Sequence, residues 1–307
     1  MILAHVGADA PSALDWNLDP FLILGILLFA GAYAYFGGLV GQRSSVRQRV
    51  TRGQALAFFA GTLVFALALV SPLDTLGDAY LFSAHMIQHM LIALVAPPLW
   101  LLGTPGWLLA PLFRRAAVVR GARWLTHPAV AFALFNGDLW LWHWPALYDA
   151  TLESEAIHVV EHLTFVATAV LFWWVVLSPL AQVPRVGYGT GILYLFAACQ
   201  PMVALGALLT FASTPFYAPY VEAPRIWGST PLGDQQLGGL IMWLPSNIPY
   251  LIALSAFFFI WVGIHDRRER EDAGEFDEPY EPREMSAGEM AGGEVGQGAA
   301  PAARSQA

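Results

Sequence analysis

Lysine is absent from the 307-residue chain, and charged residues make up only 12 % of it. A soluble domain averages about a quarter charged residues, so this composition excludes an ordinary soluble protein. The single cysteine, Cys199, excludes an intramolecular disulfide framework and any Cys-x-x-Cys metal site. The chain is instead 57 % hydrophobic, as is typical of an integral membrane protein.

Acidic charge is concentrated at the C-terminal end. The formal net charge is −8, and residues 266–307 contribute −6 of it, with eleven acidic residues against five arginines. The preceding part is therefore nearly neutral, and nothing in it indicates binding to nucleic acid. Residues 266–307 are rich in Glu, Gly and Ala and poor in large apolar side chains, so we expect a disordered acidic tail.

Seven apolar segments come near the roughly 20 residues needed to cross a hydrocarbon core. They are Phe21–Val40, Ala55–Val70, Tyr80–Leu102, Ala129–Trp144, Ala156–Leu177, Thr190–Phe211 and Leu237–Ile264. The sequence thus predicts an all-α integral membrane protein, a seven-transmembrane helix bundle over residues 20–265. The short segment 1–19 has no basic stretch before the first apolar run, so we expect no secretory signal there.

Arginine placement predicts the orientation of this bundle. The loops after the first, third, fifth and seventh segments carry the arginines, whereas the alternate loops are mainly acidic, with Arg225 as their only arginine. Cytoplasmic loops of membrane proteins are enriched in basic residues. We therefore expect residues 1–19 outside the cytoplasm and the C-terminal tail inside it.

Two histidines lie within the third apolar segment. His85 and His89 are four residues apart, so on a helix both imidazoles lie on one face. Ionisable side chains inside a membrane are costly and mark functional sites by default. The pair is therefore the first candidate site.

Three further histidines are expected at the same depth, in the outer half of the bundle. His143 lies near the outer end of the fourth segment, and His158 and His162 form a second pair in the first turns of the fifth. A lone membrane histidine is often satisfied by one interhelical hydrogen bond, but five at one depth favour a metal or haem site. His127 and His265 are expected at the opposite end.

The ligand types indicate which metal the histidines bind. Met86 and Met90 flank the first pair, and thioethers favour Cu(I), while imidazoles suit copper, zinc and iron. Apolar packing explains each methionine taken alone. An outward-facing site of histidine and methionine is best matched to copper.

Two polar residues are candidates for supporting roles. Glu161 completes the pattern His-x-x-Glu-His with His158 and His162, which also occurs in zinc metalloproteases with Glu as general base. It is equally a candidate to orient an imidazole by hydrogen bonding. Asn136 shares a helical face with His143 and is a candidate for a similar role.

The last apolar segment contains helix-breaking residues. Pro245, Asn247 and Pro249 interrupt it near its middle. Such a break either lines a cavity or is a proline kink supported by neighbouring helices.

Several motifs together resemble a known family. They are His85-Met-Ile-Gln-His89-Met, Ala96-Pro-Pro-Leu-Trp-Leu-Leu-Gly-Thr-Pro105, Trp142-His-Trp-Pro-Ala-Leu-Tyr148, Glu161-His162 and Asp234-Gln-Gln-Leu-Gly-Gly-Leu-Ile-Met-Trp243. The combination resembles the CtaG-type (caa-type) cytochrome c oxidase assembly factors. Val175 and Ser246-Asn247 depart from that family's pattern, which puts the geometry of the last helix in question.

The resemblance implies a multi-pass protein of the bacterial plasma membrane that helps assemble a haem–copper oxidase. The implied task is forming the copper centre of the oxidase catalytic subunit, which would be the partner together with other copper-delivery proteins. The residues themselves leave alternatives open: a haem b protein for electron transfer or sensing, an outward-facing zinc or di-iron enzyme, and a metal-free scaffold.

Overall fold

The computed structural model describes residues 12–40 and 49–272, and every regular element within these ranges is a helix. The elements are α1 (Pro20–Ala34), η2 (Tyr35–Val40), α3 (Arg52–Val70), α4 (Pro72–Ala79), α5 (Phe82–Met90), η3 (Leu91–Val95), α6 (Ala96–Gly103), α7 (Gly106–Leu109), η4 (Ala110–Phe113), α8 (Ala116–Leu125), α9 (Pro128–Trp142), α10 (Pro145–Glu153), α11 (Glu155–Leu177), α12 (Tyr188–Thr210), α13 (Ala218–Glu222), α14 (Pro231–Trp243) and α15 (Asn247–Asp272). The described residues up to Trp261 form one compact unit, and those from Val262 belong to a second.

Six stretches of the described chain are long and apolar enough to cross a membrane, which indicates a multi-pass membrane protein. They are Pro20–Gly38, Arg52–Val70, Phe82–Gly103, Glu155–Leu177, Tyr188–Thr210 and Pro231–Arg270. Many of their large apolar side chains are exposed, for example Phe21 and Leu28 of α1 and Leu193 of α12. Side chains of this kind on the surface of a helical bundle are what contact with lipid requires.

The fourth predicted span is the exception. α9 has only 15 residues, a rise of about 22 Å, and is too short to count as a span by length alone. Its ends are set by Pro128 at the first turn and by His143 followed by Pro145. The described helices therefore provide six candidate spans, and the seven-span count, like the orientation, stays a prediction.

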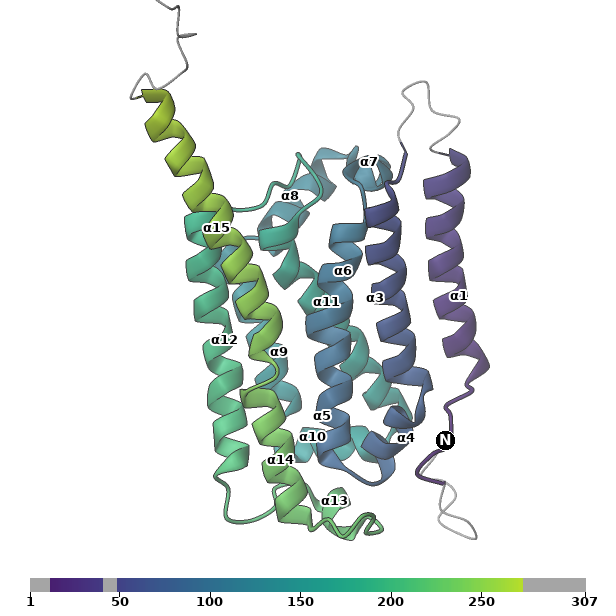
Figure 1. Cartoon of the computed structure of the whole chain (residues 1–307). Coiled ribbons are helices and arrows are strands. Elements are labelled where there is room, and N and C mark those ends of the chain that lie inside the picture. Colours follow the sequence, from purple (N-terminus) through teal and green to yellow (C-terminus); the bar gives the residue numbers. More distant parts are fainter. Residues whose placement is uncertain (1–11, 41–48, 273–307) are drawn as a thin grey trace, which may run out of the picture. The chain divides into compact units, whose positions relative to one another are not determined.

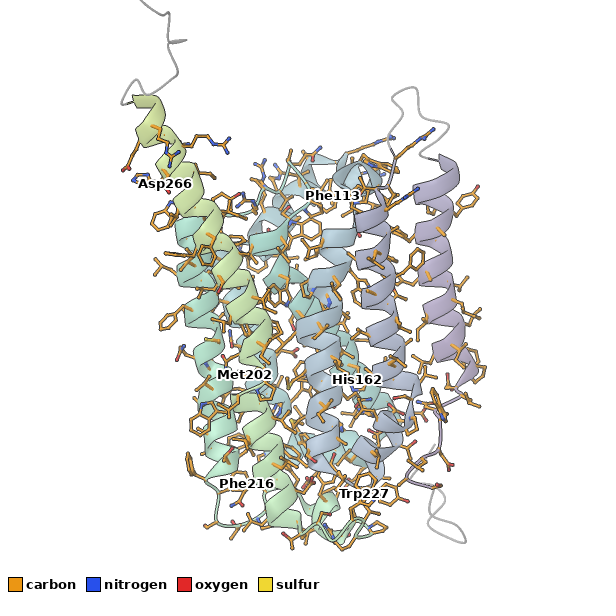
Figure 2. All side chains as sticks on the ribbon, in the orientation of Figure 1. Phe113, His162, Met202, Phe216, Trp227 and Asp266 are labelled. Atoms are coloured by element: carbon orange, nitrogen blue, oxygen red, sulfur yellow. The ribbon has the colours of Figure 1, made fainter. Side chains whose placement is uncertain are left out.

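The helices of the first unit pack in pairs. α12 lies along α14, α3 along α6, α9 along α11, and α5 along α14. The short helices α4, α10 and α13 lie at one end of the unit, and α7 and α8 lie at the other (Figure 1). His162 lies nearer the end marked by Trp227 than the end marked by Phe113 (Figure 2).

The third span runs through a π-helical turn. Pro97 has no N–H group, so the carbonyl of Ala93, four residues earlier, loses its helical donor. The segment Leu91–Val95 is wound as a π-helix, and Nε1 of Trp173 donates to the Ala93 carbonyl at 3.2 Å. π-Turns often lie beside functional sites, and this one directly follows His89 and Met90.

The last span is broken, as the prolines predict. α14 ends at Trp243 and α15 begins at Asn247. The side chains of Ser246 and Asn247 donate hydrogen bonds to the carbonyls of Met242 and Trp243. Ser246 and Asn247, which depart from the family pattern, therefore satisfy the carbonyls that the break leaves free.

The helix at the C-terminus extends beyond the expected boundary. The tail was predicted to begin at Asp266, but α15 continues to Asp272. Arg and Glu are good helix formers, and Nε2 of His265 lies 3.3 Å from Oε1 of Glu269 one turn later. The rest of the predicted tail, 273–307, lies outside the described residues, as do residues 1–11 of the predicted N-terminal segment.

Candidate metal centre

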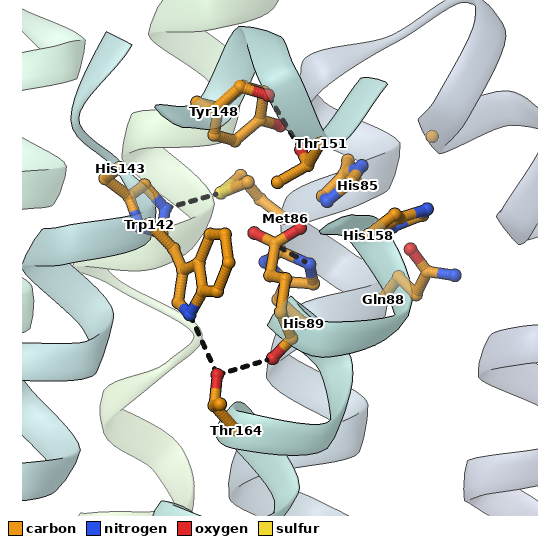
Figure 3. Close-up of polar contacts among 12 residues, drawn as sticks. His85, Met86, Gln88, His89, Trp142, His143, Tyr148, Thr151, His158 and Thr164 are labelled. Atoms are coloured by element: carbon orange, nitrogen blue, oxygen red, sulfur yellow. Dashed lines mark hydrogen bonds and ion pairs between the residues drawn. The ribbon is translucent and has the colours of Figure 1, made fainter. Parts of the chain in front are cut away.

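Four of the five predicted histidines meet between α5 and α11. His85, His89, His158 and His162 each offer a ring nitrogen, and these four atoms lie within 4.8 Å of one another. Ring centroids are 4.1 Å apart within the α5 pair, 4.2 Å within the α11 pair, 5.4 Å between His85 and His158, and 5.3 Å between His89 and His162. The two pairs thus face each other as two edges of a rectangle, here called the four-histidine cluster; Figure 3 shows three of its members, His85, His89 and His158.

Most of the ring nitrogens of this cluster lack a hydrogen-bond partner among the described residues. Both nitrogens of His85, both of His89, and Nε2 of His158 and of His162 are buried without one. Buried polar atoms in proteins are nearly always paired. A cation that accepts one lone pair from each imidazole would satisfy this donor set, so the cluster fits a metal ion.

Two carboxylates adjoin the cluster from opposite sides. Oδ1 of Asp78 lies 3.6 Å from Nδ1 of His85, and its Oδ2 lies 3.6 Å from Nδ1 of His158. Oε1 of Glu161 lies 3.8 Å from Nε2 of His89, and the Glu161 side chain is 0 % exposed. These distances are longer than hydrogen bonds, but the ionised forms of the two carboxyl groups would offset the charge of a bound cation.

The short helix α4 places Asp78. A Cβ atom on Gly77 would lie 3.0 Å from the Cα of His85, so a larger residue would push α4 away from α5 by a few tenths of an ångström. Nε2 of Gln88 donates to Oδ1 of Asp74 at 2.7 Å and fixes the same two helices to each other. The two helices therefore meet close enough for a carboxylate on one to reach a histidine on the other.

Burial also changes how the α4 carboxyls ionise. It raises the pKa of Asp78 to about 7, and burial together with the neighbouring charge of Asp78 raises the pKa of Asp74 to about 7. A cation bound nearby would favour the ionised form of both groups.

A carboxylate from α14 holds the start of α5. The residue before α5 is Leu81, whose side chain makes no capping bond. Asp234 replaces it, accepting from the backbone N–H of Phe82 at 2.6 Å and from the N–H and hydroxyl of Ser83. Acceptors at a helix N-terminus satisfy its free N–H groups, so Asp234 fixes the helix one turn before His85.

A wide cleft reaches the cluster from the α4 and α10 end. Its volume is about 900 Å³, and His158 and His162 lie on its wall. Its other polar lining residues are mostly acidic: Asp19, Asp74, Asp78, Glu153 and Glu155. The cluster is therefore reachable through a space whose charge attracts cations.

The fifth histidine lies apart from the other four. Nδ1 of His143 is 2.7 Å from the carbonyl of Leu139, and Nε2 is 3.4 Å from Sδ of Met86 (Figure 3). The sequence predicts that the five histidines form one site or two adjacent ones, and the structure gathers four of them, with His143 beside Met86 and outside that group. The reason is that α5 lies between them, with Met86 turned toward α9.

The remaining predicted residues divide in the same way. Met86 and Met90 line a small cavity next to His89. Asn136 donates to the Phe132 carbonyl of its own helix at 3.0 Å, a bond that does not involve the cluster. His127 precedes α9 at its opposite end, about 24 Å along the helix axis from His143.

Asp78 is the residue of this site that sequence reasoning missed. In the sequence it is one of two acidic residues in the loop after the second apolar segment, where nothing links it to the histidines. The signal was the pair Ser71-Pro72, an N-cap residue followed by a proline that favours the first helical position. Ser71 does accept from the N–H of Leu73 at 3.3 Å, and the helix it begins carries Asp78.

Comparison with known proteins gives one family and a few relatives. A family model described as cytochrome c oxidase caa3 assembly factor matches residues 32–263. Uncharacterized proteins of Mycobacterium bovis and Mycobacterium tuberculosis are 28 % identical over 291 residues, and one of Mycobacterium leprae is 25 % identical over 292. The aligned part covers 89 % of this chain but 43 % of each relative, so the chain spans less than half of their length. No solved structure matches.

Proposed function

Because the chain belongs to the cytochrome c oxidase caa3 assembly factor family, we propose that it binds copper in the four-histidine cluster and delivers it to the oxidase. The receiving partner is the catalytic subunit of a haem–copper oxidase, whose copper centre the ion completes. The protein then acts as a metallochaperone of the bacterial plasma membrane, and copper is its cargo.

One observation carries the proposal: four imidazoles from two helices bring ring nitrogens within 4.8 Å of one another, and six of their eight ring nitrogens are buried without a hydrogen-bond partner among the described residues. Imidazole is a common ligand of copper. Asp78 and Glu161 add the negative charge that a buried cation needs nearby.

Release is as necessary for a delivery protein as binding. The ligands come as two pairs on separate helices, and the α11 pair lies on the wall of the cleft of about 900 Å³. An acceptor that presents its own ligands through this cleft can replace the imidazoles of His158 and His162 before those of His85 and His89. The proposed orientation puts the cleft on the extracytoplasmic side.

The cluster does not favour the haem alternative. A haem held between α5 and α11 needs a flat slot between two axial imidazoles, wide enough for the macrocycle. Two imidazole pairs face each other between these helices: the ring centroids of His85 and His158 are 5.4 Å apart, and those of His89 and His162 are 5.3 Å apart. If one pair bound the haem iron, the other pair would occupy the space that the haem ring needs.

A second candidate function is a metal-dependent hydrolase facing the same side. It is favoured by the position of Glu161 between His158 and His162 and by the cleft, which is large enough for an organic substrate. A glutamate that acts as general base must reach a metal-bound water. Glu161 is completely buried, which supports a role in orienting His89 instead.

The test is metal analysis of the full chain purified in detergent after loading with copper. Replacing any one of His85, His89, His158 or His162 by Ala should lower the bound copper, while the protein remains inserted and helical. His127→Ala, at the opposite end of α9, and His265→Ala, which the sequence predicts at the same end of the bundle, should leave copper unchanged. Full copper retention in all four cluster variants would contradict the proposal, and zinc as the tightly bound metal would favour the hydrolase.

A further inference from the structure

A small cavity lies on the side of α5 that faces away from the α4 carboxylates. Its volume is about 20 Å³, enough for about one water-sized particle. Met86 and Met90 of α5, Met202 of α12 and Met242 of α14 all line it. They are the only methionines of the described residues, because Met1, Met285 and Met290 lie outside them.

Packing alone gives no reason for this distribution. Methionine fills irregular gaps in cores, and gaps of that kind occur along every span of a bundle. Elsewhere in the described spans the apolar positions are filled by leucine, isoleucine, alanine, valine and aromatic residues, without a single methionine. Four thioethers from three helices around one cavity are a set of soft ligands.

His143 supplies a harder ligand to the same cavity. Its Nδ1 must donate to the Leu139 carbonyl at 2.7 Å, because a carbonyl only accepts. In the neutral imidazole, Nε2 then carries a lone pair, and it points at Sδ of Met86 at 3.4 Å. Two electron-pair donors thus face each other with no proton between them.

The separation of these two atoms fits a shared ion. In tetrahedral zinc sites the metal–nitrogen and metal–sulfur bonds are about 2.0 and 2.3 Å, which puts neighbouring ligand atoms about 3.5 Å apart. The observed 3.4 Å is close to that value. A cation bound by both atoms would therefore require little movement of either side chain.

The charge of the surroundings indicates which ion. No carboxylate lines this cavity, whereas Asp78 and Glu161 both adjoin the four-histidine cluster. Burying an unpaired charge is costly, and the penalty rises steeply from one charge to two. The methionine cavity therefore suits a monovalent cation, and the cluster suits a divalent one better.

Glycines bring the three helices close enough to form the cavity. A Cβ on Gly206 of α12 would lie 2.8 Å from the carbonyl oxygen of Gly239 of α14, and a Cβ on Gly238 would lie 3.3 Å from Cγ of Met86. Small residues let membrane helices approach this closely. Met202 and Met242 each lie one helical turn from this contact, which directs both to the cavity.

We propose that Met86, Met90, Met202, Met242 and His143 form a second metal site, specific for Cu(I) and similar soft monovalent cations. His89 lines the cavity and is also part of the four-histidine cluster, so it adjoins both sites. The transfer of an ion between the two sites through His89 rests on the proposed function. The binding of Cu(I) by the methionine site is independent of the proposed function.

The test uses Ag(I), a redox-inert analogue of Cu(I), with the full chain in detergent. The double variant Met202→Leu and Met242→Leu keeps the apolar volume and should lose about one bound Ag(I) per chain, together with the sulfur scatterers in X-ray absorption. The matched control, Met285→Leu and Met290→Leu, makes the same substitutions outside the described residues and should bind like the original protein.

A third variant separates the two sites. His158→Ala with His162→Ala should keep the sulfur-bound Ag(I), and in a separate loading with Cu(II) it should lose the ion bound by the four-histidine cluster. Unchanged Ag(I) content and unchanged sulfur scattering in the Met202 and Met242 variant would overturn the methionine site. Loss of the sulfur-bound Ag(I) only in the Met202 and Met242 variant, with unchanged Cu(II) content in the histidine variant, would support the methionine site and contradict the four-histidine site.

Discussion

Asp78 contacts one histidine of each pair, with one carboxylate oxygen 3.6 Å from His85 and the other 3.6 Å from His158. A carboxylate beside a ligating imidazole orients the ring and raises its basicity, and its removal typically costs 10- to 100-fold in metal affinity. Asp78→Asn should therefore weaken copper binding by about 10- to 100-fold, as measured by competition with a chromophoric chelator.

Asp138 offers the matched control for this substitution. It is also a carboxylate within the bundle, but it accepts from Trp142 at 2.9 Å and Thr168 at 3.0 Å and so joins α9 to α11 without contacting a histidine. Asp138→Asn should leave the copper affinity unchanged. Equal loss in both variants would mean that Asp78 acts through the fold and not through the cluster.

Asp78 also shows which residues of the site could not be predicted from the sequence. The histidine pairs follow from residue spacing, because side chains four apart share a helical face whatever the rest of the chain does. Asp78 contacts them only because α4 folds back on α5 at Gly77. Met202 and Met242 were missed for a related reason, since their meeting depends on how α12 and α14 pack.

The third span is the element on which both proposed sites depend, and its π-turn is stabilised from outside. Trp173 donates to the Ala93 carbonyl that Pro97 leaves free. Trp173→Phe keeps the ring but removes the donor, and an unsatisfied buried carbonyl costs about 1–3 kcal/mol. We expect a loss of stability of this order in thermal unfolding, with copper binding retained at low temperature.

Trp144→Phe is the control for this element. Trp144 is 69 % exposed, so the same substitution there should leave the unfolding temperature nearly unchanged. A Trp173→Phe protein as stable as the Trp144→Phe protein would show that the π-turn does not need its external donor.

At the scale of helices, the sequence predicted the long apolar spans but not the short helices. Continuous apolar runs predicted α1, α3, α11 and α12 to within a few residues. The short helices α4, α8, α10 and α13 were missed, because helices of 5 to 10 residues have no apolar run of their own. The final helix continues past Ile264 through Arg and Glu residues. Their low hydropathy ended the predicted span at Ile264, but both residue types favour helix.

At the scale of the whole molecule, the arginine distribution predicts the orientation. Arg115, Arg120 and Arg123 lie in or beside α8, at the end opposite α4 and α10 (Figure 1). The positive-inside rule puts that end in the cytoplasm. Reporter fusions at Arg120 and Arg268 should score cytoplasmic, and a fusion at Ser229 should score extracytoplasmic.

A cytoplasmic signal at Ser229 would mean that the protein has the opposite orientation in the membrane. The four-histidine cluster and its cleft would then face the cytoplasm. That result would contradict the proposal that copper is delivered from the extracytoplasmic side. Arg47, in the first of the arginine-bearing loops, lies outside the described residues and serves as a further fusion position with the same expected result.

The acidic cleft has a consequence for the kinetics of loading. Asp19, Asp74, Asp78, Glu153 and Glu155 line a passage that a cation must cross before it reaches His158. Clefts lined by one sign of charge concentrate counter-ions and speed their association, and salt screens this effect within about 10 Å at 0.1 M. Stopped-flow loading should therefore slow steeply as ionic strength rises. Unloading requires breaking the bonds between the metal and the buried imidazoles of the four-histidine cluster, so its rate should hardly change with salt concentration.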